Sequence, residues 1–240
     1  MANFRGHIGT SGALGIGVGA FGYWYMQYDW GTACLAGGLT TIGGMLPDLD
    51  SDSGIPVREL FGLASVIAPL LLFPRVQSYG FTPEQMLVVL AAIYLVVRYG
   101  LSELFRRVTV HRGMFHSVPA MIIAGLAVFL MYRQPDSAVA ADDLRKRLYL
   151  AVGTMIGFLS HLLLDELFAV DLNGLVPKLN QFAGSALKFT SKSKPATAFT
   201  YVILVVLCGL LFLDLKPSAS AETKNPPTVS LPAQPIPASR

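Results

Sequence analysis

The four histidines of the chain are the residues best suited to chemistry, because each stands at the edge of an apolar run beside other polar residues. His7 precedes the first such run, and His161 precedes Asp165 by four positions near the end of the sixth. The other two, His111 and His116, bracket a glycine-containing segment before the fifth run. Residues four apart share one face of a helix, so the His161 imidazole and the Asp165 carboxylate can bind one ion.

A string of aspartates between residues 47 and 52 follows the second apolar run. Asp48 and Asp50 could bind one ion or bridge two. Imidazole and carboxylate together are the ligands of hydrolytic zinc, manganese or iron sites. The candidate ligands outnumber those of one tetrahedral zinc, so we expect one or two divalent ions, with zinc favoured. The expected metal ligands are His7, Asp48, Asp50, His111, His116, His161 and Asp165.

Residues that flank the expected ligands suit a hydrolytic reaction. A divalent metal lowers the pKa of a coordinated water to about 7, which supplies a nucleophile at neutral pH. Arg112 stands between two candidate ligands and could clamp a phosphate in bidentate fashion. Asp52 or Glu166 could shuttle a proton or orient a ligand. We therefore expect Asp52, Arg112 and Glu166 to be catalytic residues.

The apolar runs that must position these residues make the chain a membrane protein. Of its 240 residues, 53% are hydrophobic and 14% are charged, whereas soluble domains usually carry about 25% charged residues. A spanning helix needs ~20 mostly apolar residues, so the sequence predicts an all-α polytopic bundle of about seven spans. The runs cover residues 11–28, 31–46, 60–74, 84–105, 117–132, 147–168 and 198–215.

The first two apolar runs are rich in glycine. Gly15 and Gly19 form a pair of small residues four apart, and Gly37 and Gly38 lie in the second run. Small residues let helix backbones approach closely in lipid, so these two helices should pack inside the bundle. Ser117 is the expected N-cap of the fifth helix, because its hydroxyl can accept a hydrogen bond from the first turn.

An even number of expected spans separates consecutive polar strings. Two spans lie between His7 and the aspartate string, and two more lie between that string and His111. Another two lie between His116 and His161. All four strings should therefore meet the same membrane face. Lysine and arginine are somewhat more frequent in the segments on that side, which favours a cytoplasmic site.

The remaining composition excludes two other classes of protein. Cys34 and Cys208 both lie in apolar runs and cannot form a disulfide framework. The chain has no dense run of basic residues, so no nucleic-acid partner is expected. Residues 1–215 should form one transmembrane metal-site domain. Residues 216–240 are rich in proline, serine and alanine and should form a disordered tail.

The polar strings resemble those of the YdjM-like family of membrane-bound, metal-dependent hydrolases, which is described as regulated by the repressor LexA. The resemblance covers roughly residues 1–170. It is carried by His7, Leu46–Asp50, His111–Gly113, His116–Ser117 and His161–Asp165. It implies a hydrolase in a bacterial-type inner membrane and gives no substrate. The chain departs from the family pattern at 166–168 and in the seventh run with its tail. The ligand types are also similar to those of zinc-dependent phospholipase C and single-strand nucleases.

The expected function is hydrolysis of a phosphoester or related bond by a protein embedded in the lipid bilayer. The substrate is expected to be a small molecule or a membrane-associated compound, such as a lipid head group. Two alternatives stay open at this point: a metal-ion transporter, and a scaffold or regulatory protein with a structural metal site. Transporters place their ligands near the bilayer midplane, whereas these candidates stand at helix ends. The sequence gives no oligomeric state.

The aspartate string also has a calcium-binding interpretation. Asp48, Asp50, Asp52, Ile55 and Glu59 fall at positions 1, 3, 5, 8 and 12 of an EF-hand loop. Ser53 stands where that loop needs glycine, and apolar spans flank it instead of soluble amphipathic helices. Glu59 would be a ligand in an EF-hand and not in the hydrolase site, so its position separates the two interpretations.

Overall fold

The computed structural model describes residues 4–50, 54–103, 115–133, 140–168, 170–171, 178–179, 188–191 and 193–215, and most of them are helical. The helices are α1 (Phe4–Trp24), α2 (Trp30–Gly43), α3 (Gly54–Gln77), α4 (Pro83–Leu95), α6 (Val118–Met131), α7 (Ala140–Leu167) and α8 (Lys194–Asp214). A 3-10 helix, η1 (Pro47–Asp50), follows α2, and a π-helical stretch, η2 (Val96–Leu101), continues α4. Strands β1 (Val170–Asp171) and β2 (Lys178–Leu179) pair antiparallel. The all-α prediction is confirmed.

Each expected apolar run corresponds to one of these helices, but the helices differ in length and composition. Within the described residues, four segments are long and apolar enough to cross a membrane: 58–77, 83–101, 141–167 and 194–214. Helices α2 and α6 have 14 residues each, and α1 has 21 residues that include many glycines. Length and composition therefore support four complete spans where the sequence predicts about seven. The expected tail, 216–240, lies outside the described residues.

Side-chain caps fix where several helices begin. The Asp29 carboxylate caps α2 by accepting the Thr32 backbone N–H at 2.9 Å and the Thr32 hydroxyl at 2.6 Å. Ser117 caps α6 by accepting the Ala120 N–H at 3.3 Å, as the sequence predicts. An N-cap satisfies one of the backbone donors that a helix start leaves open. The Ser117 cap also fixes the position of the preceding residue, His116.

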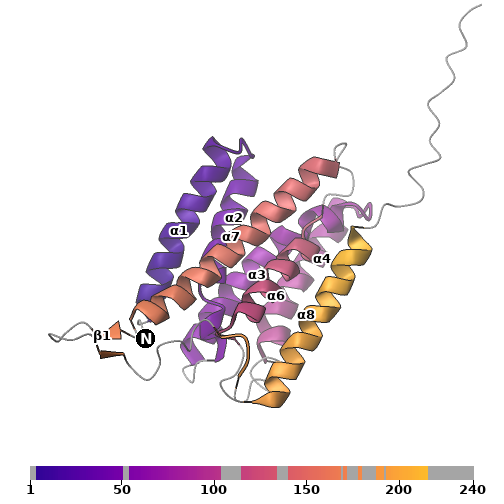
Figure 1. Cartoon of the computed structure of the whole chain (residues 1–240). Coiled ribbons are helices and arrows are strands. Elements are labelled where there is room, and N and C mark those ends of the chain that lie inside the picture. The colour runs from indigo at the N-terminus through magenta and orange to yellow at the C-terminus, as the bar shows by residue number, and fades with distance from the viewer. Residues whose placement is uncertain are drawn as a thin grey trace, which may run out of the picture.

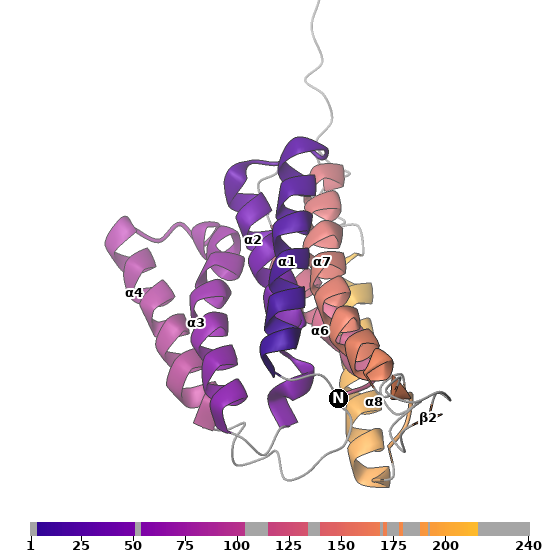
Figure 2. The ribbon, with the colours of Figure 1, turned by 90° about the vertical axis from the view of Figure 1, so that its left-hand side faces the viewer.

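Helices α1, α2 and α7 form one closely packed group (Figure 1), with α2 packed against both of the others. Helix α6 packs against α7 and contacts α8, and α3 packs against α4. Figure 2 shows the α3–α4 pair on one side of this group and α8 on the other. The group therefore joins helices that are distant in sequence.

Glycines allow α1, α2 and α7 to approach closely. A Cβ added at Gly15 would lie 2.5 Å from the Gly37 carbonyl oxygen, so α1 and α2 pack directly against each other. A Cβ added at Gly157 on α7 would overlap the carbonyl oxygen of Thr40 on α2. Both backbones are thus in direct contact with α2, and this contact sets the spacing of α1 and α7.

The polar strings collect at one end of the bundle. His7 lies near the start of α1, η1 follows α2, and His116 precedes α6. His161 and Asp165 lie near the end of α7. Figure 1 shows these helix ends together at the bottom of the bundle. The described strings therefore share one end, as the even number of intervening helices predicts.

An ion-pair network ties α8 to the opposite end of the bundle. Arg147 on α7 is only 4% exposed and pairs with Asp214 at the end of α8. Its Nε donates to the Phe129 carbonyl oxygen at 3.0 Å, and its Nη1 lies 3.6 Å from an Asp143 oxygen. Asp214 also binds Arg133, with Nη1 3.0 Å from Oδ1. This network was not expected from the sequence.

Candidate metal centre

Helix α7 contributes two side chains to the site from consecutive turns. His161 and Asp165 are four residues apart, and the His161 Nε2 lies 3.5 Å from Asp165 Oδ2. The residues are 1% and 5% exposed, respectively. Burial of an ionisable pair costs free energy unless its members bind one another or a ligand. The helical spacing predicted for this pair therefore brings both side chains into a buried site.

Helix α1 adds His7 to this pair. The His7 Nε2 lies 3.3 Å from Asp165 Oδ1, and the residue is 3% exposed. Its ring stacks on the His161 ring, with centroids 3.7 Å apart and 14° between the planes. His7 therefore belongs to the centre of the cluster, although it lies close to the N-terminus of the chain.

The segments before α6 and after α2 supply two further donors. The His116 Nε2 lies 3.5 Å from Asp165 Oδ2, and Asp48 Oδ1 lies 3.7 Å from the His161 Nε2. The side chains of His116 and Asp48 are 16% and 18% exposed, so they are more accessible than the other three. These two residues form the side of the site that a solute can reach.

A backbone carbonyl fixes the orientation of the His161 ring. His161 Nδ1 lies 2.8 Å from the carbonyl oxygen of Gly44, just after α2. A carbonyl oxygen can only accept, so Nδ1 carries the hydrogen in this contact. A neutral imidazole with its hydrogen on Nδ1 presents a lone pair at Nε2, which is the state that binds a metal. The sequence does not identify Gly44 as the hydrogen-bond partner of His161, because every residue has a backbone carbonyl.

The donor atoms fit a divalent cation. His161 Nε2, Asp165 Oδ1 and Asp48 Oδ2 are buried and make no hydrogen bond within the described part of the chain. Leaving a buried polar atom without a hydrogen bond costs about 1–3 kcal/mol, and coordination of an ion would remove this cost. Among the residues that the structure describes, ligand atoms within 4.8 Å of one another form two groups, one of His7, His161 and Asp165 and one of Asp48, His116 and His161. His161 is common to both.

The structure brings together five of the seven expected ligands: His7, Asp48, His116, His161 and Asp165. The backbone of Asp50 lies in η1, but its side chain is outside the described residues. His111 and the expected catalytic residues Asp52 and Arg112 also lie outside them. Glu166 is next to Asp165 on α7 and is half-buried, and it belongs to neither group of three donors.

Glu59 does not take the position that an EF-hand requires. It lies within α3, is 52% exposed, and pairs with Arg58 at 3.1 Å. Asp48, the first residue of the supposed loop, instead faces His161 on α7. The described residues therefore favour the histidine–aspartate site over calcium binding in a loop.

Comparison with known proteins places the chain in a family. A family model described as YdjM inner membrane protein matches residues 1–221. The chain belongs to the YdjM inner membrane protein family. The YdjM match extends beyond residue 170, so α8 is part of the family pattern and not an addition to it. The comparisons with curated proteins and with solved structures gave no match.

Proposed function

We propose that this member of the YdjM family is a membrane-bound, metal-dependent hydrolase acting on a phosphoester, such as a lipid head group. The observation that carries the proposal is the convergence of three histidines and two aspartates from four separate segments onto one buried cluster. Buried ionisable residues in a membrane protein are expensive and are commonly functional. The mixture of imidazole and carboxylate is the donor set of zinc, manganese or iron hydrolases.

The residues divide into two donor groups that could hold one or two ions. His7, His161 and Asp165 form the more buried group, and Asp48 and His116 join His161 in the more accessible one. A divalent ion held here would supply positive charge for a phosphoryl oxygen and lower the pKa of water to about 7. The Gly44 carbonyl keeps the His161 Nε2 lone pair directed toward the cluster.

The flanking residues carry the remaining proposed roles. Arg112 follows His111 in sequence and offers a planar cation that suits bidentate contact with a phosphate. Asp52 and Glu166 are the proposed proton carriers, because each directly neighbours the ligand strings. We propose that the site faces the cytoplasm, in keeping with the moderate excess of basic residues on that side.

The position of the cluster weighs against metal transport. A transporter holds its ions near the middle of the bilayer, between broken helices. Here the donors stand at the ends of helices, with Asp48 and His116 the most exposed of them. A purely structural metal would need no such accessible side. A hydrolytic site at head-group depth accounts for both features.

Elemental analysis of purified protein, together with a phosphoester hydrolysis assay, tests the proposal. We expect about one or two divalent ions per chain and metal-dependent hydrolysis, both lost in His161→Ala. The matched control is Asp142→Ala, because Asp142 lies on the same helix, is 46% exposed and pairs only with Lys146 among the ion pairs of the described residues. A His161→Ala protein that keeps its metal would refute the site. If His161→Ala loses its metal but the metal-loaded wild type hydrolyses no phosphoester, the centre has a structural role.

A further inference from the structure

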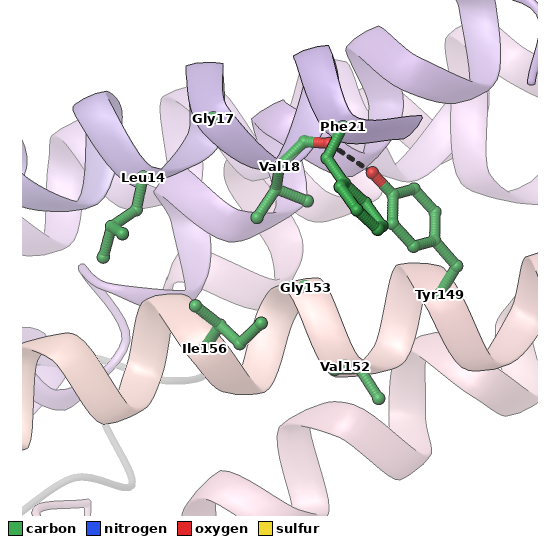
Figure 3. Close-up of a pocket in the computed structure, with 8 residues that line it drawn as sticks. All are labelled: Leu14, Gly17, Val18, Phe21, Tyr149, Val152, Gly153 and Ile156. Atoms are coloured by element: carbon green, nitrogen blue, oxygen red, sulfur yellow. Dashed lines mark hydrogen bonds between the residues drawn. The ribbon is translucent and has the colours of Figure 1, made fainter. Parts of the chain in front are cut away.

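A hollow of about 410 Å³ lies between α1 and α7, separate from the metal centre. Figure 3 shows side chains from both helices around it. Its walls include Leu14, Val18 and Phe21 of α1 and Tyr149 and Ile156 of α7. Leu14, Phe21 and Ile156 are 36%, 49% and 39% exposed, so the hollow opens sideways at the surface of the bundle. It is therefore an apolar groove on the lipid-facing side.

Small residues and one hydrogen bond keep this groove open and apolar. Gly17 has no other heavy atom within 4 Å of the position where a Cβ would stand, so a larger residue there would project into open space. The Tyr149 hydroxyl donates to the Val18 carbonyl oxygen (Figure 3) and is thereby occupied at the wall. The groove thus offers methylene and ring surface and no polar atom that needs a partner.

The groove and the metal centre lie on the same two helices. Leu14 and Phe21 follow His7 at intervals of seven residues, which places the three on one face of α1. At a rise of 1.5 Å per residue, the middle of the groove is about 13–16 Å along the helices from His161 and His7. Half of a hydrocarbon core is ~15 Å thick. The distance between the middle of the groove and the metal centre is therefore close to the distance from the bilayer midplane to the edge of the hydrocarbon core.

The lining of the hollow suits an acyl chain. Leu14, Val18, Phe21 and Ile156 contribute methyl, methylene and ring carbons, and Gly17 and Gly153 contribute no side chain. A hydrocarbon chain is equally apolar and is flexible enough to follow an open groove.

We propose that the substrate of the metal centre is a membrane phospholipid, bound with one acyl chain in the groove between α1 and α7. Its phosphate-bearing head group then lies at the histidine–aspartate cluster at the membrane surface. This inference rests on the proposed hydrolytic function and specifies its substrate class. The groove binds the acyl chain, and the more exposed donors Asp48 and His116 contact the head group.

Photo-crosslinking tests this inference without depending on hydrolysis. The full chain is reconstituted in phosphatidylglycerol vesicles that contain a phospholipid with a photoactivatable group in the middle of one acyl chain. After irradiation, mass spectrometry locates the adducts. We expect them to concentrate on the walls of the groove and to fall about tenfold in Gly17→Leu, because the leucine side chain would fill the hollow. Gly209→Leu is the matched control, since Gly209 is exposed on α8 with open space around it.

Two results would overturn the proposal. Adducts spread evenly over the lipid-facing helices, and equal in the two variants, would show that the groove holds no lipid. A dimer that Gly17→Leu converts to a monomer would show that a second copy of the chain occupies the groove. Adducts form whether or not the lipid is cleaved, so a protein that fails every hydrolysis assay can still confirm or exclude acyl-chain binding.

Discussion

The imidazole ring of His7 lies flat against that of His161, with 3.7 Å between the ring centroids. The two residues are separated by most of the helical bundle in sequence, and each lies close to an oxygen of Asp165. This stacking joins the first turns of α1 to the last turns of α7. It makes the N-terminal segment an integral part of the candidate metal centre.

Replacing His7 with alanine should weaken metal binding strongly while leaving the bundle folded. We expect metal affinity to fall by about 100-fold or more, because even outer partners of metal ligands are worth 10–100-fold. Equilibrium dialysis with zinc measures the change. Gly9→Ala is the control, since a Cβ at Gly9 meets no other heavy atom within 4 Å. Equal affinities in both variants would remove His7 from the site.

A methyl group at Gly157 should disturb the bundle where α2 meets α7. The added Cβ would overlap the Thr40 carbonyl oxygen and approach Gly44, whose carbonyl holds His161. We expect Gly157→Ala to lower stability by about 1–3 kcal/mol, the usual cost of overpacking. Unfolding in detergent measures this effect, and metal affinity should fall with it. Gly209→Ala should change neither quantity.

Loss of the Arg147 side chain should destabilise the docking of α8. Removal of one partner from a buried ion pair costs about 3–5 kcal/mol, since the other charge stays buried. Arg147→Ala should therefore lower the unfolding temperature markedly and expose α8 to proteolysis. Arg133, which binds the same Asp214 but is 46% exposed, should contribute less than about 1 kcal/mol. Comparable losses in the two variants would contradict the larger contribution expected of the buried Arg147 pair.

The N-cap of α2 should give the protein a pH-dependent contribution to stability. The hydrogen bond from the Thr32 side chain holds the pKa of Asp29 below its ordinary value. Because the folded state favours the charged carboxylate, this stability is present above the ordinary pKa and is lost as the pH falls through the lowered one. Asp29→Ala should cost about 1 kcal/mol at neutral pH. The difference from the wild type should shrink in acid, as thermal unfolding between neutral and acidic pH can measure.

The sequence predicts those parts of the site that depend on local periodicity. The shared face of His161 and Asp165 follows from the helical repeat, and the Ser117 cap follows from residue type. The common end of the polar strings follows from the order of apolar runs. Their distances do not, because they depend on how closely three backbones approach at Gly15, Gly37 and Gly157.

Contacts between distant segments were the least predictable features. The stacking of His7 on His161 requires α1 and α7 to be neighbours, and nothing in the order of the runs specifies which helices touch. The buried Arg147 network shows the same limit, because its partner Asp214 lies at the end of a different helix. The apolar runs also predict about seven spans, whereas length and composition support four among the described residues.

The assembly of the cluster from distant segments has a consequence for synthesis of the protein. His7 emerges from the ribosome first, but its partners His161 and Asp165 follow only after four further α-helices of the described residues. A chain whose translation stops before α7 therefore contains at most the donors of α1, η1 and the segment before α6. Such a fragment lacks the residue shared by both donor groups. The proposed ion can therefore meet its full set of donors only late in biogenesis, and truncated chains left in the membrane lack that set.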